Sequence, residues 1–310
     1  MSAKPAMGEH IEKFLRHLES ERGVSPHTLR AYGRDLREFA AYCRCGPEEV
    51  DLVDIRGFIS SRITAKRAKT TVARQLAALR SFFRFLHREG YIKVNRAKLV
   101  ASPRTPKHLP RFLTVDEAFD LVETPRGMGL TPVRDRAILE LLYSSGLRVS
   151  EAVGLNVDEV NVREGLVKVR GKGMKERIVP MGDKALAALK SYIIERMLFR
   201  KKRGGHDDEP ALFLNRMGGR LTDRQVRRIV SNYGMKVGIG GQLGPHTLRH
   251  TFATHLLMGG ADLRVIQELL GHSSLSTTQK YTHVDIEHLI EVYDRAHPLA
   301  EGGKRPEGGK

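Results

Sequence analysis

A proline-rich basic segment at residues 99–111 divides this chain into two parts. The segment, L-V-A-S-P-R-T-P-K-H-L-P-R, holds three prolines and four basic residues, and no apolar period continues through it. Proline fixes φ and removes a backbone donor, so neither a helix nor a central strand runs through such a segment. The sequence therefore predicts two domains, at residues 1–98 and 112–298, joined by a basic linker. A chain of 310 residues with 40% hydrophobic content can form two such cores.

Apolar residues at helical spacing are the main pattern in the first predicted domain, residues 1–98. Four helices are predicted, over residues 10–21, 26–43, 54–64 and 70–88. In the second, Ser25 is placed as the N-cap before a proline, and apolar residues recur at steps of three and four from Leu29 to Cys43. The fourth helix has an apolar inner face and an outward arginine row that is either solvated or in contact with phosphate: Arg74, Arg80, Arg84 and Arg88.

The second part is also mainly helical, with a small β-hairpin. Thr114 and Glu117 have the form of a capping box, and a strongly apolar helix at 134–144 ends before Gly146. Strand-like runs at 166–170 and 177–181 flank a G-K-G turn. Further helices are expected at 183–200, 222–235, 247–258, 262–270 and 286–295. The fold class is therefore mainly α, and residues 299–310 are expected to be disordered.

The charge of the chain indicates a polyanionic partner. Its net charge is +17 and its pI is near 10.1. Residues 1–103 hold 20 Lys and Arg against 11 Asp and Glu, and the remainder holds 33 against 25, so both parts are basic. This distribution favours a clamp on nucleic acid, with a basic protein surface or an acidic membrane as the alternatives. No apolar run approaches the ~20 residues of a membrane span and no signal peptide is evident, so a cytoplasmic protein without membrane insertion is expected.

Cofactors and metals are not expected. Cys43 and Cys45 are too few for a disulfide framework and lack zinc-ligand spacing, so reduced cysteines are predicted. His246, His250 and His255 lie close in sequence, but no carboxylate lies among them and Arg249 repels a cation. The last two histidines are therefore interpreted as structural. The G-K-G turn is not a phosphate-binding P-loop, and no nucleotide site is predicted.

Six residues in short motifs form the candidate catalytic set. The motifs are G-L-R-V-S-E at 146–151, G-K-G-M-K-E-R at 171–177, H-T-L-R at 246–249, G-H at 271–272 and Y-T-H at 281–283. Each signal is weak alone, because such residues are usually surface or packing residues. Together they are suited to holding a phosphodiester and attacking it with an oxygen nucleophile. The residues are Arg148, Lys172, His246, Arg249, His272 and Tyr281.

The chemistry of each residue type suits phosphoryl transfer. His246 and Arg249, at i and i+3 of a helix that begins after Gly-Pro, share one face beside N-terminal amides that favour phosphate. A phenol has a pKa near 10, so ionising Tyr281 at pH 7 costs roughly 4 kcal/mol. Nearby cations lower that cost, or His246 takes the proton. A deoxyribose 5′ oxygen leaves poorly without a proton, which Lys172 or a histidine would supply.

The order and spacing of these motifs resemble the tyrosine recombinases, or phage-integrase family, and within them the XerC/XerD type. His272 lies 23 residues after Arg249 and nine before Tyr281, and Lys172 lies 24 after Arg148. The segment S-P-H-T-L-R-A-Y-G-R-D-L at 25–36 resembles the start of the Xer core-binding domain. The likeness covers about residues 10–298, and the end, Y-T-H-V-D followed by Y-D-R-A-H-P, is more similar to XerC than to XerD.

The resemblance implies a four-helix, SAM-like core-binding domain and a catalytic domain of the tyrosine recombinase fold. It implies that Arg148, Arg249 and His272 bind the scissile phosphate, that Tyr281 forms a 3′-phosphotyrosyl intermediate, and that Lys172 is the general acid. The partners that the resemblance implies are double-stranded DNA, homologous recombinase subunits that form a tetramer on DNA, with XerC and XerD as one such pairing, and an FtsK-type translocase. The function that the resemblance implies is the resolution of chromosome dimers at a dif-like DNA site.

Other functions stay open from the sequence. A mobile-element integrase or transposon recombinase would share the chemistry. A type IB topoisomerase would act as a monomer without a paired site. A non-catalytic architectural DNA-binding protein would be basic and helical but would not need Tyr281.

Overall fold

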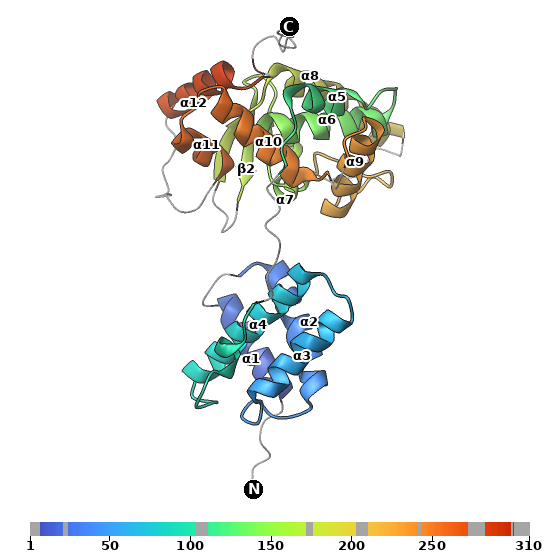
Figure 1. Ribbon diagram of the computed structural model, residues 1–310. Coiled ribbons are helices and arrows are strands. Elements are labelled where there is room, and N and C mark those ends of the chain that lie inside the picture. The colour runs from blue at the N-terminus through green and yellow to red at the C-terminus, as the bar shows by residue number, and fades with distance from the viewer. Residues whose placement is uncertain are drawn as a thin grey trace. The chain divides into compact units, whose positions relative to one another are not determined.

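Two compact units make up the chain, Met1–His108 and Leu109–Lys310, and each is described by itself. The computed structural model describes residues 7–20, 24–102, 111–171, 176–202, 210–240, 243–271, 283–298 and 300. Both units are mainly helical (Figure 1). None of the helices in these ranges is long and apolar enough to cross a membrane. The predicted tail at 299–310 lies outside the described residues, except for residue 300.

The first unit is a four-helix domain whose helices begin where the sequence supplies caps. Its helices are α1 (Met7–Ser20), α2 (Pro26–Cys43), α3 (Leu52–Thr64) and α4 (Lys69–Arg88), followed by a 3₁₀ turn, η1 (Arg96–Leu99). Ser25 accepts a hydrogen bond from the Thr28 amide at 3.2 Å, which confirms the predicted N-cap of α2. Asp51 and Asp54 form a capping box on α3.

Aromatic side chains form the centre of this first core. Phe14, Phe39, Phe58 and Phe82 are all essentially inaccessible to solvent. Phe39 and Phe58 meet edge to face with their ring centroids 5.3 Å apart, and Phe14 and Phe82 do so at 5.5 Å. Edge-to-face pairs add about 1 kcal/mol beyond the burial of their area. Phe39 and Phe82 belong to the apolar faces that the sequence predicted on the second and fourth helices.

The outward arginine row predicted on α4 is only partly correct. Arg74 forms an ion pair with the buried Asp35 of α2. Arg80 donates to Ser102 at 3.0 Å and to the carbonyl of Val100. A buried carboxylate attracts an arginine that can reach it with its flexible stem, which the helical period does not reveal. Arg74 and Arg80 therefore hold the domain together. Arg84 and Arg88 are exposed, but the Nη2 of Arg88 also lies 3.1 Å from the Nε2 of His17 on α1.

The second unit surrounds a small antiparallel sheet with helices. The sheet has the order β1 (Val160–Asn161), β2 (Leu166–Arg170) and β3 (Glu176–Pro180), and Val167 of β2 pairs with Val160 of β1 and with Val179 of β3. The sequence predicted β2, β3 and most helices within a few residues. It did not predict β1, which is too short for a period of two to show. The elements are α5 (Val115–Glu123), α6 (Leu130–Ser145), α7 (Val149–Gly154), η2 (Val157–Glu159), β1 (Val160–Asn161), β2 (Leu166–Arg170), β3 (Glu176–Pro180), α8 (Asp183–Lys202), α9 (Asp223–Lys236), α10 (Pro245–Met258), α11 (Leu263–Leu270) and α12 (His283–Ala296).

Helix α6 is the central helix of this unit. All of its residues from Ala137 to Ser145 are buried, and a helix that is buried on every side lies inside a core. It packs against α5, α7, α8, α9 and α10. Its end places Ser144 where the hydroxyl accepts a hydrogen bond from the Gly182 amide at 2.9 Å.

The last helix, α12, packs on its own domain. Leu289, Val292 and Tyr293 are buried, and the Tyr293 hydroxyl lies 2.9 Å from the Ser144 hydroxyl. The Tyr293 ring stacks on His297 with centroids 4.9 Å apart. The helix predicted at 286–295 thus packs against the core of its own unit.

Glu140 of α6 is a buried carboxyl with an unusual titration. The side chain is 0% exposed, and neither oxygen has a hydrogen-bond partner in the described part of the chain. Burial raises the pKa of Glu140 to about 7. Between the ordinary value of 4.5 and about 7, only the unfolded chain loses the proton, so this group lowers stability as the pH rises.

We expect Glu140→Gln to raise the free energy of unfolding at pH 8 by up to about 3 kcal/mol and to change it little at pH 5. Urea unfolding of the full chain at both pH values measures this. Glu291→Gln, on the exposed face of α12, is the matched control. An equal effect of Glu140→Gln at the two pH values would contradict the raised pKa.

Candidate active site

A glycine turn at the end of α6 positions Arg148. Gly146 ends the helix with φ +58, a left-handed conformation that side chains disfavour. A Cβ there would also lie 2.3 Å from the Phe252 ring, so only glycine fits. The chain then turns through the buried Leu147, and Arg148 becomes the N-cap residue of α7. The Arg148 side chain is 36% exposed and can meet a ligand.

Helix α10 supplies the second arginine. Gly244 is its N-cap and Pro245 is the first helical residue, so the helix begins two residues before the predicted start at residue 247. Arg249 lies one turn further on and donates to the carbonyl of Gly146 at 2.7 Å and to that of Leu270 at 2.6 Å. His246, three residues earlier on the same turn, is exposed. The first turn of α10 therefore brings a guanidinium and an imidazole to one end of the helix.

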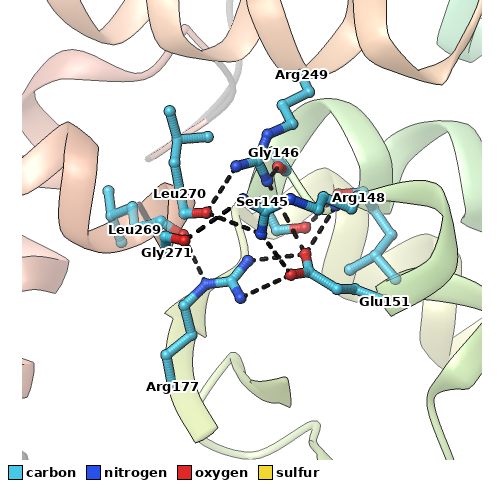
Figure 2. A network of polar contacts seen from close by, with 10 residues as sticks. Ser145, Gly146, Arg148, Glu151, Arg177, Arg249, Leu269, Leu270 and Gly271 are labelled. Atoms are coloured by element: carbon cyan, nitrogen blue, oxygen red, sulfur yellow. Dashed lines mark hydrogen bonds and ion pairs between the residues drawn. The ribbon is translucent and has the colours of Figure 1, made fainter. Parts of the chain in front are cut away.

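Glu151 joins the two predicted arginines. Its carboxylate accepts hydrogen bonds from the backbone amide and the Nη1 of Arg148, both at 2.8 Å. The Nη1 of Arg249 lies 3.9 Å from the same carboxylate. The side chain of Glu151 is only 4% exposed, so these contacts lie in a desolvated site (Figure 2). Arg148 also approaches the carbonyls of Leu270 and Gly271 at 3.4 Å.

Arg177 of β3 is a third arginine in this network, and sequence reasoning missed it. Its Nη1 and Nη2 each donate to a separate oxygen of Glu151 at 2.9 Å, and its Nε donates to the carbonyl of Leu269 at 2.9 Å. The signal was present in the alternation of β3, where Arg177 and Val179 both face inward. An arginine on the apolar face of a strand requires a buried partner.

The electrostatics of this cluster favour an anion. Burial and repulsion from Arg148 lower the pKa of Arg249 to about 10, so it stays charged at neutral pH. Burial alone would raise the pKa of Glu151, but hydrogen bonds and charge from Arg177, with the hydrogen bonds from Arg148, hold it below its ordinary 4.5. Three guanidiniums thus face one carboxylate, and the excess positive charge is suited to a phosphate group.

The structure brings together only part of the predicted set. Arg148 and Arg249 share Glu151 and the carbonyl of Leu270, and His246 lies on the same helical turn as Arg249. Lys172, His272 and Tyr281 lie outside the described residues. In the sequence Lys172 directly follows Gly171, the last described residue after β2, and His272 directly follows Gly271.

The neighbouring histidines of α10 are accounted for by packing. His255 is buried, its Nδ1 lies 2.8 Å from the Tyr143 hydroxyl and its Nε2 lies 3.0 Å from the carbonyl of Leu113. Burial lowers the pKa of His255 below its ordinary value. The expected structural role of His255 is thus confirmed, and His250 packs near the ring of Phe112.

Comparison with known protein families shows which family this chain belongs to. The model of the phage integrase family matches residues 111–288, and that of the N-terminal SAM-like domain of phage integrases matches residues 11–90. The chain belongs to the phage integrase family. These tyrosine recombinases cleave and rejoin DNA through a phosphotyrosine intermediate and act on DNA as multimers. The predicted enzyme class and the mainly helical fold class are therefore confirmed.

Relatives of this tyrosine recombinase match over nearly its whole length. Tyrosine recombinase XerC of Thermodesulfovibrio yellowstonii is 58% identical over 292 residues, which cover 94% of this chain and 97% of that protein. Tyrosine recombinase XerC of Pelobacter propionicus is 50% identical, with 94% and 96% covered. The solved structure of XerH recombinase on a palindromic difH substrate, a post-cleavage complex, matches with a TM-score of 0.64 and 25% identity, covering 92% of this chain and 83% of that one. The predicted resemblance to the Xer type is confirmed.

We expect Glu151→Gln to lower the free energy of unfolding by about 3 kcal/mol at pH 7, because three arginines lose their buried counter-charge. The pKa of Glu151 lies below 4.5, so the stabilisation is fully present above pH 4.5 and is lost as the pH falls through the lower folded value. The difference in free energy of unfolding between wild type and variant should therefore stay constant above about pH 4.5 and narrow below it in urea titrations. Glu176→Gln, at an exposed ion pair with Lys168, is the control and should have little effect. A gap that widens on acidification would refute the assignment.

Proposed function

We propose that this tyrosine recombinase resolves chromosome dimers at a dif-like DNA site, together with a homologous partner recombinase. The observation that carries the proposal is the pair of arginines, Arg148 and Arg249, which converge on one desolvated anion-binding position. The XerC names of its near-full-length relatives support the biological role. The XerH structure on difH supports the type of DNA site.

The proposed reaction divides the work among the six residues. Arg148, Arg249 and His272 hold the non-bridging oxygens of the scissile phosphate. The Tyr281 hydroxyl oxygen bonds to phosphorus and passes its proton to His246, while the bond from phosphorus to the 5′ oxygen breaks. Lys172 gives a proton to that oxygen as it leaves. The resulting 3′-phosphotyrosine keeps the energy of the original ester, so rejoining needs no nucleotide.

The two units have complementary roles in this proposal. Residues 1–98 form the core-binding domain, residues 99–111 follow the DNA backbone as a basic linker, and residues 112–298 carry the catalysis. Both domains are basic, which supports contact with DNA from two sides. Four subunits assemble on two sites in the cytoplasm, with XerC and XerD types as the proposed pair and an FtsK-type translocase as the regulator.

A nicked duplex that loses its 5′ fragment after cleavage tests the nucleophile. We expect wild type to form a covalent protein–DNA adduct that survives denaturing electrophoresis, and Tyr281→Phe to form none, because phenylalanine has no hydroxyl oxygen to bond to phosphorus. Tyr233→Phe on α9, whose hydroxyl contacts Asp135, is the matched control and should still form the adduct. An adduct with Tyr281→Phe would remove Tyr281 from its role.

DNA affinity should depend steeply on salt. If each domain contacts several phosphates, affinity is expected to fall by roughly 10³-fold or more between about 50 and 200 mM salt, because each contact releases counterions. Titration of the Tyr281→Phe variant with a labelled duplex measures binding without cleavage. A salt response close to flat would contradict the two-sided DNA contact.

A further inference from the structure

Arg177 is buried beside the predicted catalytic residues but cannot touch DNA. Its side chain is 6% exposed, and all three of its nitrogens donate to groups of the protein. Two of those bonds form a parallel pair with the Glu151 carboxylate, the strongest geometry available to an arginine. The third reaches the carbonyl of Leu269 at the end of α11.

Arg177 determines how much of the negative charge of Glu151 remains uncompensated for Arg148 and Arg249. One Glu151 oxygen accepts from the Nη1 of Arg148 and from the Nη1 of Arg177. The other accepts from the Arg148 amide and from the Nη2 of Arg177, with Arg249 at 3.9 Å. Arg177 thus neutralises the carboxylate while Arg249 stays without a short contact to it. Figure 2 shows Arg177 and Arg249 approaching the network from opposite sides.

Arg177 also contacts the C-terminal end of α11. Gly271 has φ +65, and a Cβ on it would lie 3.1 Å from the Nη1 of Arg177. The carbonyls of Leu269, Leu270 and Gly271 accept in turn from Arg177, from Arg249 and from Arg148. The three guanidiniums therefore share both a carboxylate and one helix end.

We propose that Arg177 is a positioning residue for DNA cleavage, which acts through Glu151 to keep Arg148 and Arg249 directed at the scissile phosphate. Without Arg177, the buried carboxylate has only these two arginines to neutralise it. It then draws their guanidiniums toward itself and away from the phosphate, so cleavage slows while binding of the DNA backbone elsewhere continues. The inference rests on the proposed recombinase reaction.

Arg177 lies on β3, which follows Lys172, the proposed general acid, in the sequence. A competing explanation for slower cleavage is therefore that loss of Arg177 displaces Lys172 instead of the two phosphate-binding arginines. A bridging sulfur in place of the 5′ oxygen separates the two explanations. A thiolate leaves without a proton because thiols are far more acidic than alcohols. Loss of the general acid is therefore rescued by sulfur, whereas loss of the phosphate contacts is not.

The experiment measures single-turnover adduct formation at saturating DNA for wild type, Arg177→Met and Arg177→Lys, on oxygen and sulfur substrates. We expect Arg177→Met to slow cleavage about 100-fold on both, as for a small misplacement of catalytic groups. Arg177→Lys keeps the positive charge but cannot form the paired hydrogen bonds with Glu151, and we expect it to lower the cleavage rate about tenfold. The Kd for DNA should stay within about threefold, because the buried side chain makes no phosphate contact.

Arg170→Met is the matched control, since Arg170 lies on the neighbouring strand, makes no contact with Glu151, and pairs with the exposed Glu176 and with the largely buried Glu159. Urea unfolding confirms that each variant is folded at the assay temperature, and Arg177→Lys carries the test if Arg177→Met is not folded. Cleavage by both Arg177 variants at the wild-type rate, or full rescue by sulfur, would overturn the proposal. Failure of wild type to form any adduct would instead overturn the recombinase reaction on which it rests.

Discussion

The ion pairs around the Glu151 carboxylate are the interactions on which the second unit depends. The carboxylate lies almost wholly out of solvent and is surrounded by the guanidiniums of Arg148, Arg177 and Arg249. A lone buried carboxylate is strongly disfavoured, and so are two buried arginines without a counter-charge. Each group is therefore stable only in the presence of the others. The cluster joins α7, β3 and α10. Because three guanidiniums surround one carboxylate, the site also keeps a net positive charge.

The surrounding core explains why this cluster holds its geometry. Helix α6 is buried on every side and ends at Gly146, whose left-handed turn brings Arg148 back toward α10. The carbonyl of Gly146 then accepts from Arg249, so the turn is itself a part of the site. At the same helix end Ser144 contacts Tyr293 of α12 and the Gly182 amide. Polar groups at a helix end thus connect the candidate active site to α12.

Local patterns predicted most of the fold because their causes are local. The Ser25 cap, the capping box at Thr114 and the glycine after α6 each act through neighbouring backbone groups. Arg74 and Arg80 were misjudged because their partners, Asp35 and the carbonyl of Val100, are distant in sequence. Arg177 was missed for the same reason: it appeared as one basic residue among several in a hairpin, and its partner lies 26 residues away.

The sequence by itself determined most of the helices, since periodicity and capping are properties of short stretches. It also predicted a division at the proline-rich segment and a set of residue types for phosphoryl transfer. Arg148 and Arg249 were predicted as site residues in this way, although 101 residues separate them. Only the tertiary structure decided that both contact Glu151, that Arg177 completes the cluster and that α12 packs on its own domain. These outcomes follow from burial, because the environment of a charge depends on which distant elements exclude water from it.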